Sequence, residues 1–140
     1  MLTALIDYES GNLHSALKAF EKISSENSLG SVTITNDPEI ISNADRLVLP
    51  GDGAFPACKA ALEKSEVFEA LKHAVLAKRR PFLGICVGMQ LMAKKGFEFE
   101  PTNGLNWING QVERIQLDDP SLKIPHMGWN EIAIDHDHAI

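Results

Sequence analysis

The sequence predicts an α/β fold in which a mostly parallel β-sheet carries helices on both faces, with an antiparallel extension toward the end of the chain. Short apolar runs alternate with segments of helical periodicity over residues 1–92. From Gly104 onward the pattern changes to alternating apolar and polar residues, which is typical of antiparallel strands. The length of 140 residues fits one domain, spanning 1–140, with a hydrophobic core of its own.

The first strand is predicted at residues 2–6, a short apolar run. Residues 7–12 are rich in turn and helix-capping residues, and apolar residues then recur at helical spacing over residues 13–23. A second strand is predicted at residues 31–35, which are rich in β-branched side chains, and Asp37-Pro38 opens a short helix. Because the loop at residues 7–12 follows a strand, it lies at the carboxyl edge of the sheet, where open α/β sheets bind ligands.

The third strand is predicted at residues 45–49 and runs into a glycine-rich loop at residues 50–56. Helices are predicted at residues 57–64 and 67–78, the second with its apolar side chains on one face. The fourth strand is predicted at residues 81–86. Since these strands alternate with helices, the loops that follow them converge on one edge of the sheet.

The C-terminal part has a different character. Residues 94–103 are mixed in composition and indicate turns. Residues 112–117 and 132–134 alternate in polarity and predict antiparallel strands joined by the loop at residues 118–120.

Residues 81–92 carry the strongest chemical signal. Cys86 stands between Gly84 and Gly88, a pattern in which a nucleophile occupies a sharp turn between a strand and a helix. A side chain two residues away on either side would collide with neighbouring backbone. The Val87 amide, at the N-terminus of the predicted helix, can stabilise a thiolate and later an oxyanion. The alternative is a structural cysteine buried at a strand end.

The glycine loop is the second candidate part of this site. Gly51 and Gly53, on either side of Asp52, permit backbone conformations closed to other residues and can aim amide groups into a site. Taken alone, such a loop is usually a plain turn. Beside Cys86 it can supply the second oxyanion donor that a cysteine hydrolase needs.

A cysteine hydrolase also needs a base. His126, set among turn residues, is the candidate on chemistry alone, and the alternative is a structural loop histidine. His73 falls on the polar side of a predicted helix, where we expect a solvated side chain. His136 and His138 have aspartate neighbours, but residues two apart on an exposed tail seldom bind metal. We therefore predict no metal site and no cofactor.

The composition excludes several classes of protein. The net charge is −6, and no cluster of basic residues indicates nucleic-acid binding. No apolar run approaches the length of a membrane span, and no charged region precedes the first apolar run as in a signal peptide. Two cysteines without a secretory signal indicate reduced thiols and a cytoplasmic protein.

Taken together, the motifs resemble those of the class I (triad) glutamine amidotransferases. The likeness rests first on residues 84–91 and 50–55. Three further segments, residues 7–13, 107–110 and 125–130, are similar to the glutaminase subunits of imidazole glycerol phosphate synthases. The resemblance covers essentially the whole chain and implies the three-layer, flavodoxin-like fold of that family.

The resemblance also implies an activity. Such subunits hydrolyse glutamine and pass ammonia to a (β/α)8-barrel cyclase subunit, which makes imidazole glycerol phosphate and AICAR in histidine biosynthesis. The site residues that it implies are Cys86 as the nucleophile that forms the glutamyl thioester; Gly51, Asp52, Gly53 and Val87 in the oxyanion hole; Gln90 and Gly84 at the substrate glutamine; and Asn12, Met127 and Trp129 facing the cyclase.

The sequence departs from the family pattern in three places. Glu9 and Asn106 stand where the family usually or often carries glycine. The family's base and its carboxylate partner come from a His-Pro-Glu motif that does not occur here, and the chain ends at Ile140. We therefore expect a member lacking the family's C-terminal part, or a degenerate relative, and assign no catalytic base. His126 then belongs to a structural and interface segment.

Two alternative functions remain open at this stage. One is a glutaminase that serves a different synthase, and the other is a non-catalytic docking domain that has lost its base. Absence of the family's C-terminal part explains the missing base more simply than either, and the missing strands would leave a hydrophobic sheet edge, which predicts poor solubility or association.

Overall fold

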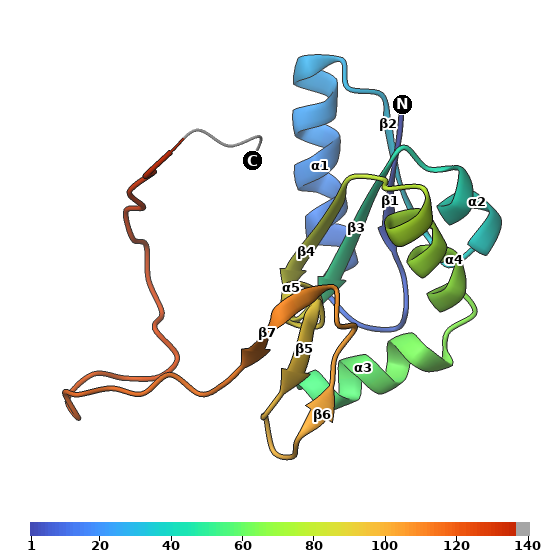
Figure 1. The fold of residues 1–140 in the computed structure, drawn as a ribbon. Helices are drawn as coiled ribbons and strands as arrows, with labels where there is room; N and C mark the ends of the chain where they lie inside the picture. The colour runs from blue at the N-terminus through green and yellow to red at the C-terminus, as the bar shows by residue number, and fades with distance from the viewer. Residues whose placement is uncertain (137–140) are drawn as a thin grey trace.

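A four-stranded parallel sheet forms the centre of the molecule, with strand order β2-β1-β3-β4 (Figure 1). The computed structural model describes residues 1–136. The strands are β1 (Leu2–Ile6), β2 (Ser31–Thr35), β3 (Arg46–Gly51) and β4 (Phe82–Cys86). All three pairings are parallel, which confirms the predicted class of sheet.

The central strands form because their residues are buried on both faces, as in a sheet covered by helices. In β1, the side chains from Ala4 to Ile6 are inaccessible to solvent. Leu5 lies in register with Ile34 of β2 on one side and with Val48 of β3 on the other. Since the strands are parallel, their carboxyl ends and the loops that follow them meet at one edge.

Helices cover both faces of this sheet, as predicted (Figure 1). Helix α1 packs beside β2, and the remaining helices share the core on the opposite face. The helical segments are α1 (Leu13–Asn27), α2 (Pro38–Asn43), α3 (Phe55–Lys64), α4 (Phe68–Lys72), a π-helical turn η1 (His73–Ala77) and α5 (Val87–Gln90). Asn12 caps α1 by accepting a hydrogen bond from the Ser15 N–H at 3.2 Å.

The core lies between the sheet and helices α2 to α5. Alternate strand residues such as Ile6, Leu47 and Leu49 face it, because successive side chains of a strand point to opposite faces. Helices α3 and α4 contribute Leu62 and Leu71, which are fully buried. This packing anchors the loops that carry the predicted site.

A second, three-stranded sheet follows in the order β6-β5-β7. Its strands are β5 (Ala93–Gly96), β6 (Thr102–Asn103) and β7 (Ile108–Val112). Strand β5 pairs antiparallel with β6 and parallel with β7. The sequence indicated only turns over residues 94–103, so β5 and β6 correct that expectation. Phe82 and Trp107 join the two sheets through an edge-to-face contact with ring centroids 5.2 Å apart.

Residues 113–136 contain no helix or strand, and every side chain in this segment is exposed. In Figure 1 the segment runs away from the helices and the sheets. The antiparallel strands predicted at residues 112–117 and 132–134 are therefore wrong, apart from Val112 at the end of β7. Alternating polarity fits one face of a sheet, but a strand also needs a hydrogen-bonding neighbour. Within the described part of the chain, this segment pairs with none.

Glu9 and Asn106 both adopt left-handed backbone conformations, with φ of 67° and 56°. These are the two positions where the resembling family usually or often carries glycine. Glycine reaches positive φ without the steric penalty that a Cβ atom imposes. At both positions this chain therefore carries a side chain in a backbone conformation that glycine would adopt without strain. Across residues 1–136, no helix combines the length and apolar character needed to cross a membrane.

Candidate functional site

Cys86 ends strand β4 and lies directly before helix α5, with its side chain exposed. Its backbone has φ 55° and ψ −116°, which a residue other than glycine rarely adopts. Such strain persists only where the surrounding structure imposes it, and it gathers at functional sites. The structure thus contains the sharp turn between a strand and a helix that the sequence predicts.

The glycines on either side permit this turn. A Cβ atom at Gly84 would lie 2.6 Å from the Met89 Cα, and one at Gly88 would overlap the Leu49 carbonyl oxygen. Both clashes are with backbone, which cannot rotate away as a side chain can. The structure therefore confirms the prediction that a side chain at either glycine would clash with neighbouring backbone.

The glycine loop lies next to Cys86. Gly51 is the last residue of β3 and pairs in register with Cys86. A Cβ atom at Gly51 would lie 2.6 Å from the Gly88 nitrogen and 3.0 Å from the Tyr8 hydroxyl. Gly53 has φ 122°, which favours glycine. This loop is therefore packed against the nucleophile turn.

Three side chains contact the backbone of this loop, Tyr8 and Ser10 from the segment after β1 and Cys58 from helix α3. Tyr8 donates a hydrogen bond to the Pro50 carbonyl at 2.8 Å. The Ser10 hydroxyl donates to the Asp52 carbonyl at 3.0 Å and accepts from the Asp52 N–H at 3.2 Å. The Cys58 Sγ lies 3.3 Å from the Ser10 hydroxyl and 3.6 Å from the Asp52 carbonyl oxygen. We call Tyr8, Ser10 and Cys58 the loop-facing cluster.

The loop-facing cluster is polar but poorly solvated. Tyr8 and Cys58 are 2% and 3% exposed. Burial raises the pKa of Tyr8 to about 12, because the tyrosinate would lose its hydration there. Tyr8 therefore stays neutral at physiological pH and keeps its O–H as a hydrogen-bond donor.

The other predicted site residues surround the same turn. Val87 is buried at the start of α5, and Gln90 ends that helix with its side chain half-buried. Asp52 is exposed, and its N–H is occupied by Ser10. The structure therefore brings together all the residues predicted around the nucleophile; their roles stay predictions.

Sequence reasoning missed the loop-facing cluster and Glu98. The Glu98 carboxylate accepts a hydrogen bond from the Phe55 N–H at 2.7 Å, at the start of helix α3. Ala54, at the N-cap position of helix α3, has no side chain that can cap the helix. Glu98, in the turn between β5 and β6, therefore serves as the cap. Ser10 lies in a loop at the predicted ligand-binding edge, whereas no local signal in the sequence indicates Glu98.

The residues predicted to face a partner lie on separate elements. Asn12 caps helix α1, whereas Met127 and Trp129 are 85% and 104% exposed on the segment 113–136. The sequence predicted helix-capping residues within residues 7–12, and the structure shows that Asn12 is the one that caps α1.

The histidines do not complete a catalytic site in the described part of the chain. Within residues 1–136, no imidazole hydrogen-bonds to the Cys86 thiol. His73 is exposed, as predicted, and His126 and His136 are exposed on the segment 113–136. His138 lies outside the described residues. In the part that is described, no group of three or more histidine, cysteine or acidic residues could hold a metal.

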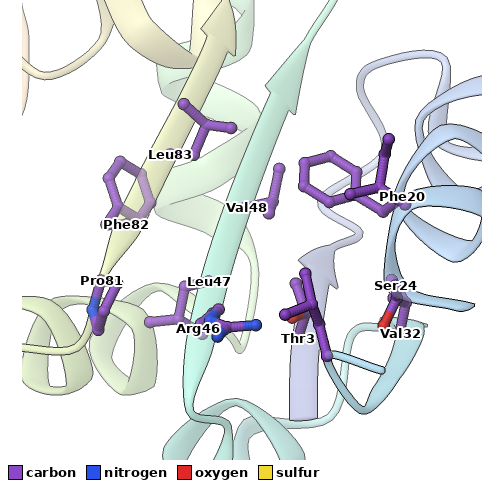
Figure 2. A pocket seen from close by; sticks show the side chains of 12 residues that line it. Thr3, Phe20, Ser24, Val32, Arg46, Leu47, Val48, Pro81, Phe82 and Leu83 are labelled. Carbon is purple, nitrogen blue, oxygen red and sulfur yellow. The ribbon is translucent and has the colours of Figure 1, made fainter. Parts of the chain in front are cut away.

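An apolar groove of about 500 Å³ lies on the face of the sheet that carries α1. Figure 2 shows Phe20 of α1, Val48 of β3 and Leu83 of β4 lining it. A second cavity of about 380 Å³ lies beside Asp7 and Tyr8. Cys86 lines neither of these two cavities, and its side chain is exposed at the end of β4.

A comparison with known protein families decides which family this is. Residues 4–139 match the model of the class-I glutamine amidotransferases. The chain belongs to the class-I glutamine amidotransferase family. The matched range includes both the Cys86 turn and the glycine loop.

Individual proteins of this family are similar to the chain over nearly its whole length. The chain is 55% identical to the imidazole glycerol phosphate synthase subunit HisH of Cereibacter sphaeroides and 57% identical to that of Ruegeria pomeroyi. Each alignment covers 100% of this chain and 66% of the relative. The subunit of the same name from Caulobacter vibrioides is 50% identical over 98% of this chain. The chain thus spans about two thirds of the length of these relatives.

Proposed function

We propose that this chain is a glutaminase subunit of imidazole glycerol phosphate synthase, which releases ammonia from glutamine at Cys86. The observation that carries the proposal is the strained backbone of Cys86, with φ 55°, between two glycines that backbone atoms crowd. A residue held in a sparsely populated backbone region is energetically unfavourable by roughly 1–3 kcal/mol. A docking domain without catalysis has no use for this strain, which argues against that alternative.

The proposed chemistry is acyl transfer to a thiolate. The Cys86 sulfur attacks the γ-amide carbon of glutamine, the carbon–nitrogen bond breaks, and ammonia leaves with a proton from a general acid. Water then hydrolyses the thioester to give glutamate and the free thiol. The amides of Val87 and of the Gly51–Gly53 loop are the proposed oxyanion donors, with Gln90 and Gly84 at the substrate.

The proposal assigns no base among the described residues, because no imidazole there reaches the Cys86 thiol. Loss of one member of a catalytic triad lowers turnover by several powers of ten. We therefore assign to this chain only the nucleophile, Cys86, and the turn that carries it. Such a site should react with a covalent label even if its turnover of glutamine is slow.

The names of the relatives support the choice of synthase. They are subunits of imidazole glycerol phosphate synthase, so the proposed partner is the cyclase subunit, a (β/α)8 barrel that makes imidazole glycerol phosphate and AICAR. Asn12, Met127 and Trp129 are the proposed contacts. Free thiols at Cys58 and Cys86 fit a reducing compartment, and we place the protein in the cytoplasm.

The test measures two reactions of the 140-residue chain. A glutamine-shaped chloromethyl ketone should label Cys86 with saturable kinetics, and free glutamine should compete. Ammonia release from glutamine should stay several powers of ten below that of a full-length relative, with or without the cyclase subunit and its nucleotide ligand. Cys86→Ala should abolish the labelling. Labelling of Cys86 that neither saturates nor responds to glutamine would refute the proposal.

A further inference from the structure

The apolar groove on the face of the sheet that carries α1 has a polar end. Thr3 of β1 lies in register with Arg46 of β3, where both strands begin. Two residues further along, on the same face, Val48 lies in register with Leu83 of β4. All four residues line the groove (Figure 2). The polar pair therefore precedes an apolar row by about 6.6 Å along the strands.

The Arg46 guanidinium has no carboxylate partner in the described part of the chain. Its one hydrogen bond there joins Nη2 to the Met1 Sδ at 3.5 Å, and a thioether is a weak acceptor. The neighbouring Asp45 carboxylate instead accepts from the Leu2 N–H and pairs with Arg80. Arg46 is half-buried, so its charge has lost part of its hydration. Such a guanidinium favours a bound anion.

The Thr3 side chain adds a hydroxyl beside this charge. Thr3 is 7% exposed, and its hydroxyl makes no hydrogen bond to any residue of the described chain. Ser24, which also lines the groove, already donates to the Gly30 carbonyl at 2.7 Å. A nearly buried hydroxyl without a partner is unfavourable, and an oxygen of a ligand would satisfy it. Arg46 and Thr3 together offer donors to both oxygens of a carboxylate.

The remainder of the groove fits a hydrocarbon chain. Phe20 and Ile23 of α1 form one wall, and Val48 and Leu83 lie on the sheet. The volume of about 500 Å³ is typical of a site for one small ligand. Among the described residues that line the groove, Arg46 alone is charged. A membrane surface is bound through clusters of basic residues, so a single charge favours a free molecule with one carboxylate.

We propose that the groove binds a free medium-chain alkyl carboxylate. Its carboxylate lies at Arg46 and Thr3, and its tail lies along Val48 and Leu83. Cys86 does not line the groove, so this site is separate from the candidate site and does not depend on the proposed glutaminase function.

The first measurement is calorimetric titration of the 140-residue chain with hexanoate, octanoate and decanoate, each below the concentration at which it forms micelles. Each added methylene should tighten binding about fourfold until the tail outgrows the groove. Decyltrimethylammonium has a decyl tail with the opposite charge and should bind at least about tenfold more weakly than decanoate. Absence of decanoate binding, or equal affinity for the two decyl compounds, would overturn the proposal.

Substitutions at the polar end separate the head of the ligand from its tail. Arg46→Gln should weaken decanoate binding about tenfold and leave the increment per methylene unchanged. Thr3→Val, which keeps the shape of the side chain, should weaken it about fivefold. Arg114→Gln is the matched control, because Arg114 is exposed on the segment 113–136 and does not line the groove. An equal loss in Arg46→Gln and Arg114→Gln would overturn the proposal.

A second measurement locates the ligand without any substitution. In NMR spectra, decanoate should shift the amide resonances of Val48 and Leu83 and leave that of Leu71, in the core on the opposite face, unchanged. Shifts confined to other residues would contradict the proposed site. Sedimentation tests a different occupant. A dimer that Leu83→Lys abolishes and decanoate does not dissociate would assign the groove to a second copy of the chain and overturn the proposal.

Discussion

At the scale of single residues, steric exclusion shapes the nucleophile turn more than attraction does. Cys86 is left-handed because β4, α5 and the glycine loop converge there, and the backbone atoms around Gly84 and Gly88 leave no space for a Cβ. The attractive contacts come from the loop-facing cluster, which binds the backbone of Pro50 and Asp52. The backbone conformation of Cys86 therefore fixes the position of its Cβ atom at the edge of the sheet.

Gly88→Ala should lower the free energy of unfolding by about 3 kcal/mol, because its methyl group would overlap the Leu49 carbonyl oxygen. Gly110→Ala is the matched control, since a Cβ there meets no atom within 4 Å. We expect it to be neutral or slightly stabilising. Denaturant titrations of both variants measure these effects. Equal stability in the two would mean that the turn can relax around an added methyl group.

Tyr8 makes stability fall at alkaline pH. Its pKa is about 12 in the folded chain and near 10 when exposed, so the unfolded chain loses the proton first as the pH rises. The free energy of unfolding should therefore be unaffected by this group below pH 10 and should fall between about pH 10 and 12. Tyr8 is the only tyrosine in the sequence, so tyrosinate absorbance reports it directly.

Tyr8→Phe should remove that part of the alkaline decrease in stability, at a loss of about 1 kcal/mol at neutral pH from the hydrogen bond to Pro50. A Tyr8 titration in the folded chain centred at pH 10 would contradict the role of burial.

At the scale of elements, helix α1 shows how one residue can have two roles. Asn12 was predicted to face a partner subunit, and the structure places it at the N-cap of α1, bound to the Ser15 N–H. A side-chain cap satisfies one of the N–H groups that a helix leaves without an internal partner. The two roles are compatible, because only one of its polar atoms is used by the cap.

Asn12→Ala should lower the free energy of unfolding by about 1 kcal/mol, whereas Asn12→Ser, which keeps a capping oxygen, should change it little. Thermal unfolding followed by circular dichroism measures both. If Asn12 also contacts the cyclase, the serine variant should bind that subunit more weakly at nearly unchanged stability. Unchanged stability in the alanine variant would exclude the cap as a significant contribution.

At the scale of the whole molecule, the two faces of the central sheet differ. Helices α2 to α5 seal one face around the core. On the other face, α1 packs beside β2 and leaves the apolar groove along β3 and β4, where Leu83 is 38% exposed (Figure 2). An apolar groove of about 500 Å³ is large enough to admit a small apolar molecule.

The groove should bind an apolar fluorescent dye, and Leu83→Lys should weaken that binding because it places a charge on the groove wall. The free energy of unfolding should change by no more than about 0.5 kcal/mol, since Leu83 is already partly solvated. Leu76→Lys is the control, because Leu76 is 54% exposed but does not line the groove. Equal loss of dye binding in both variants would point to binding elsewhere.

Much of the fold could be predicted from the sequence, because local patterns express it. The four strands of the central sheet follow from apolar runs, and α1 to α4 follow from helical periodicity and from caps such as Asp37. The nucleophile turn at Cys86 could be predicted for the same reason: its glycine spacing is a local steric requirement.

Tertiary structure alone decided features that depend on contacts between distant residues. Ser10 hydrogen-bonds to Asp52, and Glu98 to Phe55, because the fold brings β1, β3 and the second sheet together. The spacing of residues along the sequence does not predict contacts of this kind. The failed strand prediction over residues 112–117 has the same cause, because alternating polarity specifies a face while pairing needs a neighbouring strand. The sequence by itself determined the class of fold, the sharp turn at Cys86 and the family resemblance, since each depends on local spacing. The tertiary structure decided which side chains hold the glycine loop and toward which side its central amide points.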